Sequence, residues 1–365
     1  MFYYLPLESY QERYTSLMSI KDGWIEDKLK RNNVSFERIE GERLNVDSRI
    51  EKGVVLDFFG RSYYSLLQNA NVVKMIKEGK IVNGDILYYD DFWTPGMEAV
   101  VYAAELIGIK LNIYAMLHAQ SVDKYDFTYK LKRWLRHYEI GQSKFMKGIF
   151  VTSEYLYDLC VEAGIENVYF GGLPYNKDFI LRKFKDETIK KENQVIYTSR
   201  LDVEKDPLFF VRFAEFCKEK GLDYKFVITT SAKEIRSNDS SIITALKKAA
   251  EKGIVEIKTN LTKEEYYKEL QKSKYQFNCA LQDWLSWTLL EALTFRCIPI
   301  YKKYRSFPEF LPSKFLYEKN NVESVYDVLM SNKEFDEDLL KIVDFFDNSF
   351  ERYLDVIEKT KEIDR

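Results

Sequence analysis

The chemically promising residues gather in the stretch QDWLSWTLLEALTFRCIPIY, residues 282 to 301. Asp283 and Glu291 lie eight positions apart, and between them is a turn that carries Ser286, Trp287 and Thr288. LLEALTFRC is typical of a helix, so we expect this turn at a helix N-terminus, where free backbone N–H groups and the helix dipole attract an anion. The pattern suits a phosphate flanked by two hydroxyl-bearing rings. A capped helix with solvated acids explains the spacing equally well.

A second cluster, YTSRLDVEKDPLFFVRF, covers residues 197 to 213. We expect Arg200 and Lys205 in a loop after a strand, followed by a helix that Pro207 begins at a favoured position. Two cations beside a helix start suit a diphosphate leaving group, because Arg offers a rigid fork and Lys a point charge. Taken alone, the cluster is better explained as a surface loop whose cations pair with the neighbouring acids Asp202, Glu204 and Asp206.

Short apolar runs alternate with longer amphipathic segments, which is typical of parallel βα units. Strands are expected at FYYLPL, GVVLDFF, DILYYDD, LNIYAML and GIFVTS, and again at QVIYTSRL, YKFVITT, GIVEIKT and YQFNCAL. The sequence therefore predicts an α/β fold with two doubly wound, Rossmann-like domains at 1–173 and 194–338, facing each other across a ligand-binding cleft. The charged stretch 174–193 is expected as a linker, and 339–365 as a C-terminal helix that packs back toward the first domain.

Composition excludes several classes of protein. The 365 residues carry a net charge of −3, which does not indicate a globally basic nucleic-acid binder. Four widely spaced cysteines and two histidines make a structural zinc site improbable and favour free thiols. No apolar run approaches 18 residues and no signal peptide is recognised at the N-terminus, so we expect a cytoplasmic protein.

Taken together, the two clusters resemble the retaining glycosyltransferases of the GT-B fold that carry an E-x7-E signature, the glycosyltransferase family 4-like group. Asp283 stands at the first acid, Glu291 in LLEAL at the second, and CIPIY supplies the closing strand. SRLDVEK matches the G-R-L-x-x-x-K motif of that group. The resemblance covers the predicted second domain and, more weakly, FVTSEYLYDL and GGLPYN.

This resemblance implies an enzyme that uses a nucleotide sugar, expected to be a UDP-sugar, as co-substrate, with no bound cofactor and no metal requirement. Arg200 and Lys205 would hold the diphosphate, Glu291 the ribose hydroxyls and Asp283 the hydroxyls of the donor sugar. The turn Ser286–Thr288 would contact phosphate or sugar.

The sequence also departs from the family pattern. The first acid is Asp283 instead of Glu, one methylene shorter, which leaves the identity of the sugar open. Arg296 replaces the glycine usual in the following helix, and Trp284 and Ser286 stand where the family has a glycine after the first acid.

Two stretches of the first half carry further candidates. YYDDFWTPGMEA, residues 88 to 99, places Asp90, Asp91 and Trp93 between a strand and a helix that Pro95 can open. The carboxylates fit a helix cap, a group that positions the acceptor hydroxyl, or a general base if the enzyme is inverting. His118 follows another strand; many relatives have a histidine there that contacts the donor sugar, although a lone histidine is more often structural.

The segment KYDFTYKLKRWLRHYEIGQSKFMK, residues 124 to 147, holds seven Lys or Arg against two acids, interleaved with aromatic residues. It is explained either as a solvated amphipathic helix or as a basic, aromatic surface for a polyanionic acceptor such as DNA. Lys132, Arg133 and Arg136 are the candidate contacts of the second alternative.

The phrases LPLESYQERY, YYDDFWTPGMEA and DWLSWTLLEA are also similar to glycosyltransferases of tailed phages that modify hydroxymethylated pyrimidines in DNA. The leading hypothesis is therefore a retaining transferase with modified phage DNA as acceptor, acting in the host cytoplasm. The alternatives are a transferase for a cell-surface glycan or lipid-linked acceptor, and a sugar-nucleotide epimerase or non-catalytic binding protein. The oligomeric state is left open.

Overall fold

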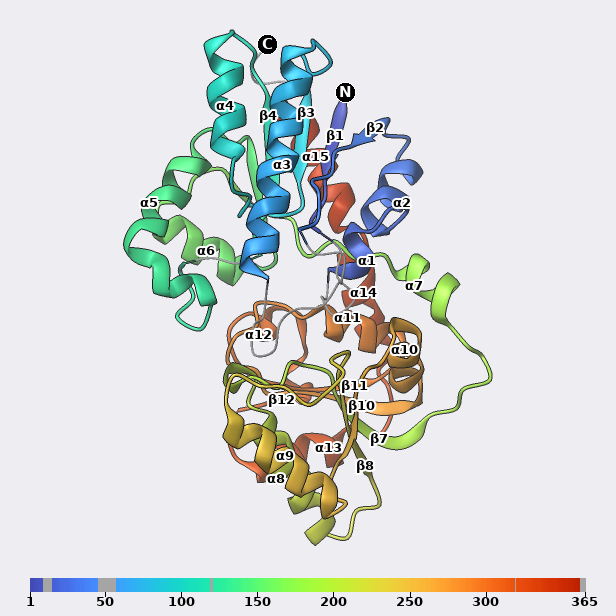
Figure 1. Ribbon diagram of the computed structural model, residues 1–365. Helices are drawn as coiled ribbons and strands as arrows, with labels where there is room; N and C mark the ends of the chain where they lie inside the picture. Colours follow the sequence, from blue (N-terminus) through green and yellow to red (C-terminus); the bar gives the residue numbers. More distant parts are fainter. Residues whose placement is uncertain (9–14, 45–56, 119–120, 319, 362–365) are drawn as a thin grey trace. The chain divides into compact units, whose positions relative to one another are not determined.

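The computed structural model describes residues 1–8, 15–44, 57–118, 121–318 and 320–361 (Figure 1). The described residues divide into two compact units. Unit 1 holds the described residues up to Tyr175 together with those from Asn348 onward, and unit 2 is Asn176–Asp347. Each unit is built on one parallel six-stranded sheet.

The sheet of unit 1 has the strand order β2-β1-β3-β4-β5-β6, and all its strand pairs are parallel. The chain winds one way from β1 to β2 and the other way from β3 onward, so the topological switch point lies between β1 and β3. Ligands bind beyond the carboxyl ends of strands at such a point. The strands are β1 (Phe2–Leu5), β2 (Phe36–Arg38), β3 (Ile86–Tyr89), β4 (Asn112–Met116), β5 (Gly148–Val151) and β6 (Val168–Phe170).

Helices cover both faces of this sheet. The side chains of neighbouring β3 residues point to opposite faces, and each contacts a helix on its own side. The Tyr89 hydroxyl donates to Asn69 of α3 at 2.8 Å, whereas Tyr88 packs against Tyr353 of α15 (Figure 1). The helices of unit 1 are α1 (Ser16–Ser19), α2 (Trp24–Arg31), α3 (Phe58–Lys77), α4 (Met97–Leu106), η1 (Phe127–Leu131), α5 (Lys132–Ser143), α6 (Glu154–Glu162) and α15 (Ser349–Lys361).

The C-terminal helix α15 is an integral part of unit 1. Its Tyr353 ring stacks on Phe150 of β5 with 3.9 Å between centroids, and the Tyr353 hydroxyl donates to the Gly172 carbonyl at 2.5 Å. A Cβ at Gly171 would lie 2.3 Å from the Tyr353 ring, so only glycine allows this approach.

The sheet of unit 2 has the order β12-β11-β10-β7-β8-β9, again with parallel pairs throughout. This is the doubly wound Rossmann order, and its switch point lies between β7 and β10. The strands are β7 (Glu192–Tyr197), β8 (Lys225–Thr229), β9 (Glu256–Lys258), β10 (Ser273–Asn278), β11 (Ile298–Lys302) and β12 (Leu316–Tyr317).

Aromatic rings stack on one another in the core of unit 2. Phe213 stacks on Phe277 of β10, and Phe277 stacks in turn on Tyr317 of β12. The helical elements of this unit are α7 (Lys177–Phe184), η2 (Val203–Lys205), α8 (Pro207–Glu219), α9 (Ser240–Glu251), α10 (Lys263–Lys272), α11 (Trp287–Thr294), α12 (Phe307–Phe310), η3 (Ser313–Phe315), α13 (Val322–Ser331), η4 (Glu337–Leu339) and α14 (Leu340–Asp347).

The predicted α/β class with two doubly wound sheets is confirmed, while several local predictions differ from the structure. The run GVVLDFF is no strand where it is described: Asp57 accepts from the Gly60 N–H as the N-cap of α3, and Phe58 and Phe59 form its first, exposed turn. Residues 53–56 of that run, and 9–14 of LPLESYQERY, lie outside the described residues. The short strands β2, β6 and β12 were not expected from the sequence.

The segments expected as a linker and as one C-terminal helix also look different. Helix α7 lies within 174–193, and 339–365 contains two helices, α14 in unit 2 and α15 in unit 1. Asp347, at the end of α14, accepts from the backbone N–H of Lys177 at the start of α7, at 2.6 Å. This bond fastens α14 to unit 2, and the chain enters unit 1 directly after it.

Candidate functional site

The two sequence clusters meet at the switch point of unit 2. The Nζ atom of Lys205 lies 2.8 Å from Oδ1 of Asp283, and Asn278 at the end of β10 donates to Oδ2 of the same carboxylate at 3.1 Å. Lys205 follows β7 and Asp283 follows β10, the two strands that flank the switch point. The ion pair therefore lies where a doubly wound sheet binds its ligands.

Local hydrogen bonds hold the loop that carries Lys205. The buried Tyr197 hydroxyl, at the end of β7, donates to the carbonyls of Arg200 and Lys205 at 3.0 and 2.9 Å. The backbone N–H of Leu281 donates to the Glu204 carbonyl at 2.8 Å, which joins this loop to the one after β10. Asp206 has a φ of 44°, a left-handed conformation that is strained for a non-glycine residue and is fixed by these surroundings.

The Lys205 side chain is held in this position by burial and hydrogen bonds. Its side chain is 8% exposed and that of Asp283 is 17% exposed, and Nζ also donates to the carbonyl oxygen of Gln282. Charges that are partly removed from water interact more strongly than surface pairs and are costly to separate. The pair is therefore a fixed feature of the site rather than a surface contact.

The N-terminus of α11 lies four residues beyond Asp283. Ser286 is the N-cap residue, but its side chain makes no capping hydrogen bond and instead lies 2.6 Å from the Thr288 hydroxyl. Trp287, the first residue of the helix, is buried. The Ser286 side chain therefore does not cap the backbone N–H groups of the first turn of α11. These N–H groups and the hydroxyls of Ser286 and Thr288 together suit an anion.

Buried polar side chains at the strand ends complete this region, and the sequence analysis missed them. Gln276 and Asn278 alternate on β10, and Tyr301 follows on β11; none of the three side chains is exposed to solvent. Gln276 donates to the Thr198 hydroxyl at 3.0 Å, and the Tyr301 hydroxyl is near Gln276, Asn278 and Thr288. The signal in the sequence was two amides at alternate positions of the apolar strand YQFNCAL.

Glu291 is buried between α11 and α10. Its Oε1 accepts from the Tyr267 hydroxyl at 2.6 Å and its Oε2 from the Tyr266 hydroxyl at 2.8 Å. Burial raises the pKa of Glu291, while Lys263 and the two tyrosines act in the opposite direction. Each carboxylate oxygen can accept a further bond, so this arrangement orients the group without saturating it.

Arg200 pairs with neighbouring acids, as expected if this cluster is a surface loop. Its guanidinium pairs with Asp202 at 2.7 Å and with Glu204 at 2.8 Å, and the side chain is 39% exposed. A cation that the sequence analysis missed is Arg305, whose guanidinium lies 4.3 Å from the centre of the Trp284 ring beside Asp283. Like Asp206, Arg305 has a positive φ, of 53°.

In unit 1, Asp90 belongs to the core at the switch point. Its Oδ2 accepts from the Tyr4 hydroxyl at 2.6 Å, the Ser19 hydroxyl at 2.8 Å and the Leu7 N–H at 3.2 Å. Burial raises the pKa of Asp90 to about 6 despite these donors. Its other oxygen, Oδ1, is buried without a hydrogen-bond partner among the described residues, and the carboxylate has no surface open to an acceptor.

His118 is tied to the same strand end. Its Nε2 lies 2.8 Å from the backbone carbonyl of Asp90. Because a carbonyl only accepts, Nε2 carries the proton in this contact. The ring is thereby oriented at the carboxyl end of β4, next to the end of β3.

Asp91 is part of an ion triad that the sequence did not indicate. Arg61 of α3 donates to Glu8 at 2.9 Å and to Asp91 at 3.4 Å, and all three side chains are largely buried. Asp91 also accepts from the Trp93 N–H at 3.1 Å, which closes the turn after β3. A triad around one guanidinium fixes Asp91 between β1, β3 and α3.

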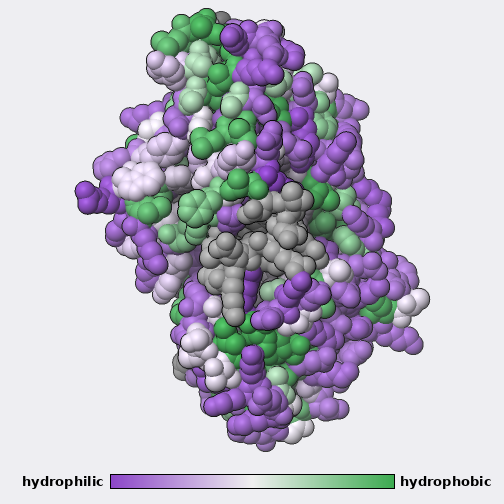
Figure 2. Space-filling model, in the orientation of Figure 1, coloured by the Kyte–Doolittle hydropathy of each residue, from purple (hydrophilic) through white to green (hydrophobic). Residues whose placement is uncertain are grey.

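The basic, aromatic segment forms η1 and α5. Figure 2 shows pale and hydrophilic groups side by side on this face of unit 1. Trp134 is 52% exposed, and its ring meets Trp93 edge-on with 6.2 Å between centroids, while Tyr138 packs on Trp93 at 5.5 Å. Arg133 is exposed on the same helix. An exposed tryptophan supported by two other rings is suited to stacking.

The other two basic candidates of this segment are engaged within it. Lys132 donates to the Tyr129 hydroxyl at 2.7 Å. Arg136 donates to the Ser121 hydroxyl at 2.9 Å, beside the buried Glu139, which binds the same serine. Arg136 therefore fastens the loop after β4 to α5.

No group of three or more His, Cys, Asp or Glu side chains among the described residues is arranged to hold a metal ion. No described helix is long and apolar enough to cross a membrane.

No protein-family model and no curated protein matches the sequence. Solved structures do match. A glycosyltransferase from Rickettsia africae has a TM-score of 0.63 at 13% identity, with 98% of each chain covered. An alpha-glucosyltransferase in complex with UDP and a 13-mer DNA containing a HMU base has a TM-score of 0.61 at 14% identity, covering 98% of this chain and 99% of that one.

The pneumococcal O-GlcNAc transferase GtfA, in complex with UDP and GlcNAc, has a TM-score of 0.58 at 13% identity. The match covers 82% of this chain, which spans only 60% of the pneumococcal chain. At these identities the likeness establishes the architecture and not the activity. Together with the two doubly wound sheets, it shows that this chain has the fold of the GT-B glycosyltransferases.

Proposed function

We propose that this protein is a glycosyltransferase that moves a sugar from a UDP-sugar to an acceptor hydroxyl, with retention at the anomeric carbon. The observation that carries the proposal is the ion pair of Lys205 and Asp283 at the switch point of unit 2. Asp283 lies four residues before the start of α11. This arrangement joins a cation, a carboxylate and a helix N-terminus at one strand edge. A diphosphate linked to a sugar presents the complementary groups, an anion and hydroxyls.

Within this site, each group has a proposed role. Lys205 and the first turn of α11 bind the diphosphate, and Asp283 binds hydroxyls of the donor sugar. Glu291, oriented by Tyr266 and Tyr267, binds the ribose hydroxyls. Ser286 and Thr288 supply hydroxyls beside the phosphates. Arg200 contributes a second cation once a diphosphate competes with its neighbours Asp202 and Glu204.

The proposed reaction uses these groups in the following way. The bond between the anomeric carbon and the diphosphate oxygen breaks, and its electron pair leaves with the diphosphate. The acceptor oxygen forms the new bond on the same face and passes its proton to an oxygen of the departing diphosphate, so that the products are UDP and the glycoside. Negative charge grows on the leaving group, which is why Lys205 and the α11 N-terminus stabilise the transition state more than the ground state. In unit 1, we assign His118 a contact with the donor sugar and Asp91 a role in positioning the acceptor.

The proposed acceptor is DNA that contains a hydroxymethylated pyrimidine. The exposed Trp134 ring, its supports Trp93 and Tyr138, and the adjacent Arg133 form a surface suited to a base and a phosphate. One structural neighbour is described as a complex with UDP and DNA that contains a HMU base. The phage-like phrases of the sequence support the same acceptor.

The deciding experiment measures donor binding and transfer separately. Thermal unfolding of the full chain with UDP, UDP-glucose and other nucleotide sugars should show a raised midpoint with its UDP-linked donor, because a ligand that binds only the folded state stabilises it. The same donor is then incubated with duplexes that differ only in one pyrimidine, hydroxymethylated or unmodified. Mass spectrometry of the nucleosides should find the sugar on the hydroxymethylated base alone.

The alternatives predict other results. Interconversion of the nucleotide sugar without any acceptor would identify an epimerase and overturn the transferase. Transfer to a glycan or lipid-linked acceptor, with none to DNA, would keep the donor site and reject the proposed acceptor. A β-linked product from an α-linked donor would reject retention.

A further inference from the structure

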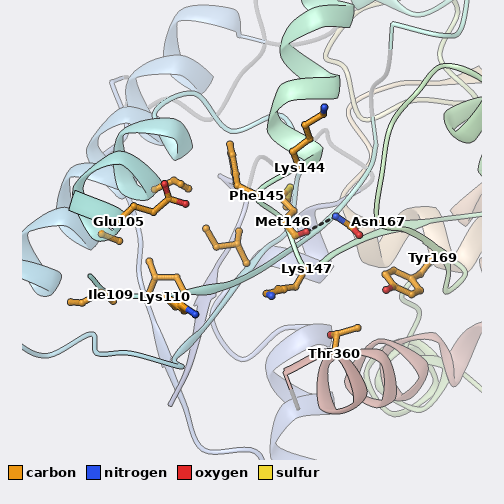
Figure 3. Close-up of a pocket in the computed structure, with 14 residues that line it drawn as sticks. Glu105, Ile109, Lys110, Lys144, Phe145, Met146, Lys147, Asn167, Tyr169 and Thr360 are labelled. Atoms are coloured by element: carbon orange, nitrogen blue, oxygen red, sulfur yellow. Dashed lines mark hydrogen bonds between the residues drawn. The ribbon is translucent and has the colours of Figure 1, made fainter. Parts of the chain in front are cut away.

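A pocket of about 470 Å³ opens at the amino ends of β4 and β5 in unit 1. It lies at the opposite edge of the sheet from Asp90 and His118, which follow the carboxyl ends of β3 and β4. Its lining comes from the end of α4, the starts of β4 and β5, the residues around β6 and the end of α15 (Figure 3). Its volume is in the range of small-molecule sites, and no role proposed above uses it.

The charge of this pocket is predominantly positive. Lys110, Lys144 and Lys147 line it, against the single acid Glu105. Lys144 points away from the other two lysines in Figure 3 and lies 3.7 Å from Glu166. Lys110, whose side chain is exposed, and Lys147 are the other two cations of the lining. No described residue is paired with the Lys110 ammonium group, so the charge of Lys110 is available to an anion.

The backbone around these lysines is fixed. The Lys110 N–H donates to Asn83 Oδ1 at 2.9 Å, and its carbonyl accepts from Gly84 at 2.9 Å. The Lys147 N–H donates to the Ile113 carbonyl at 2.8 Å. The turn before Lys147 is braced by Asn167, whose amide donates to the Met146 carbonyl at 2.9 Å (Figure 3). Because the backbone is already fixed, only the two lysine side chains have to be ordered when an anion binds between them.

The remaining wall is apolar. Val101, Ala104, Phe145 and Met146 face the same space as the lysines. At the end of α4, its last residue Leu106 is 69% exposed and the adjoining Ile107 is 62% exposed. Lysine stems commonly lie along apolar surface with the charge in water, and here the ammonium groups and the apolar wall together offer complementary surfaces to an anion that carries a hydrocarbon group.

We propose that this pocket binds a phosphate ester with an apolar substituent, at a site separate from the nucleotide-sugar site. The phosphate contacts Lys110 and Lys147, and the substituent lies against Phe145 and Met146. The hydroxyl of Tyr169, also in the lining, is a further donor to the phosphate. A soluble phosphomonoester and the headgroup of an anionic lipid share this chemistry, and the exposed Leu106 and Ile107 fit the second source.

The test uses the full chain and hexyl phosphate as probe, with hexanol and inorganic phosphate as comparisons. Calorimetric titration should show that hexyl phosphate binds more tightly than either comparison. The double variant Lys110→Gln/Lys147→Gln should bind it at least tenfold more weakly. The control variant Lys74→Gln/Lys77→Gln changes two lysines of α3 in the same unit and should bind like the wild type. Equal affinity of both variants, or no binding of the probe, would overturn the proposal.

Two further arms identify the ligand and the site. Co-sedimentation with vesicles of phosphatidylcholine and phosphatidic acid, but not of phosphatidylcholine alone, that is lost in the Lys110/Lys147 variant identifies the lipid headgroup as the source. Binding of hexyl phosphate without vesicle binding identifies a soluble ester. Saturating UDP should leave the affinity for hexyl phosphate unchanged. Competition between the two would place the probe in the nucleotide site and refute a separate one.

Discussion

Lys205 and Asp283, 78 residues apart in the chain, form an ion pair of 2.8 Å at the switch point of unit 2. Each residue came from a cluster that the sequence alone left ambiguous, one as a surface loop and the other as a capped helix. Their direct contact links the two clusters in one site, and it also gives Lys205 two roles. It neutralises Asp283 in the free protein and, under the proposed function, binds the diphosphate.

These two roles of Lys205 can be separated by mutation. In Lys205→Met the Asp283 carboxylate loses its cation, so unit 2 should be destabilised by about 1–3 kcal/mol, below the cost of breaking a fully buried pair. Adding Asp283→Asn removes the unpaired charge and should recover most of that loss in urea unfolding. Affinity for UDP should stay at least tenfold reduced in both variants, because both lack the Lys205 cation that binds the diphosphate.

The control for that comparison is Asp283→Asn alone, which keeps Lys205 and should retain UDP binding while it weakens binding of the UDP-sugar. Wild-type UDP affinity in Lys205→Met would remove Lys205 from the diphosphate role. Failure of the double variant to recover stability would show that the pair contributes little to the fold.

The ribose role of Glu291 is testable through the ligand. Wild-type protein should bind UDP more tightly than 2′-deoxy-UDP, because the 2′-hydroxyl donates to the carboxylate. Glu291→Gln should lose about tenfold or more in UDP affinity, a charge-assisted hydrogen bond being worth about 1.5–3 kcal/mol, and should no longer discriminate between the two nucleotides. Isothermal titration of both ligands measures this directly.

Tyr266→Phe is the matched control for Glu291. It removes one hydroxyl that orients the carboxylate but leaves the carboxylate itself, so discrimination between the two nucleotides should persist at a lower affinity. If Glu291→Gln still prefers UDP as strongly as the wild type, another group binds the 2′-hydroxyl.

The sequence predicted the sheets well because alternating apolar runs and amphipathic segments reflect burial, which is a local property of each strand. Strands β1, β3, β4 and β5 follow such runs. The run at Phe58 and Phe59 misled because an apolar composition does not reveal exposure. In the structure these residues form the exposed first turn of a helix.

The site was predictable in its motifs but not in its contacts. Nothing local distinguishes Arg200, which pairs with its sequence neighbours, from Lys205, which reaches across to the loop after β10. Asp90 and Asp91 are adjacent in the chain, yet one lies in the core of unit 1 and the other binds Arg61. Such differences depend on which distant element packs against each side chain, and a single sequence does not contain that information.

The departure at Arg296 has a physical explanation in the structure. Arg296 follows the C-terminus of α11 with a φ of 59°, the left-handed conformation in which a helix-ending glycine is favoured. Its guanidinium pairs with Glu337, but both side chains are more than half exposed. The glycine that the resembled family carries at this position would therefore adopt this left-handed conformation with less strain than the arginine does.

Arg296→Gly should accordingly stabilise unit 2 by about 0.5–1 kcal/mol, because relief of left-handed strain outweighs an exposed ion pair. Arg296→Ala is the matched control: it removes the same pair but keeps a Cβ, and it should be no more stable than the wild type. Urea unfolding of the three proteins under one set of conditions measures the difference. Equal stability of the glycine and alanine variants would show that the pair, not the backbone, determines the outcome.

Asp90 provides a test by pH. Burial raises its pKa from 3.8 to about 6, so the folded protein binds this proton more tightly than the unfolded chain does. The stabilisation of the folded state by this proton is therefore complete below pH 4 and is lost as the pH rises through about 6, a change of about 3 kcal/mol at 1.36 kcal/mol per pKa unit.

Asp90→Asn keeps an acceptor for Tyr4, Ser19 and Leu7 and cannot ionise. The melting temperature of the variant relative to the wild type should rise between pH 4 and 7, with most titrations of other groups cancelling in the difference. A difference that stays constant over this range would mean that Asp90 ionises normally in the folded protein, and that its three donors compensate fully for burial.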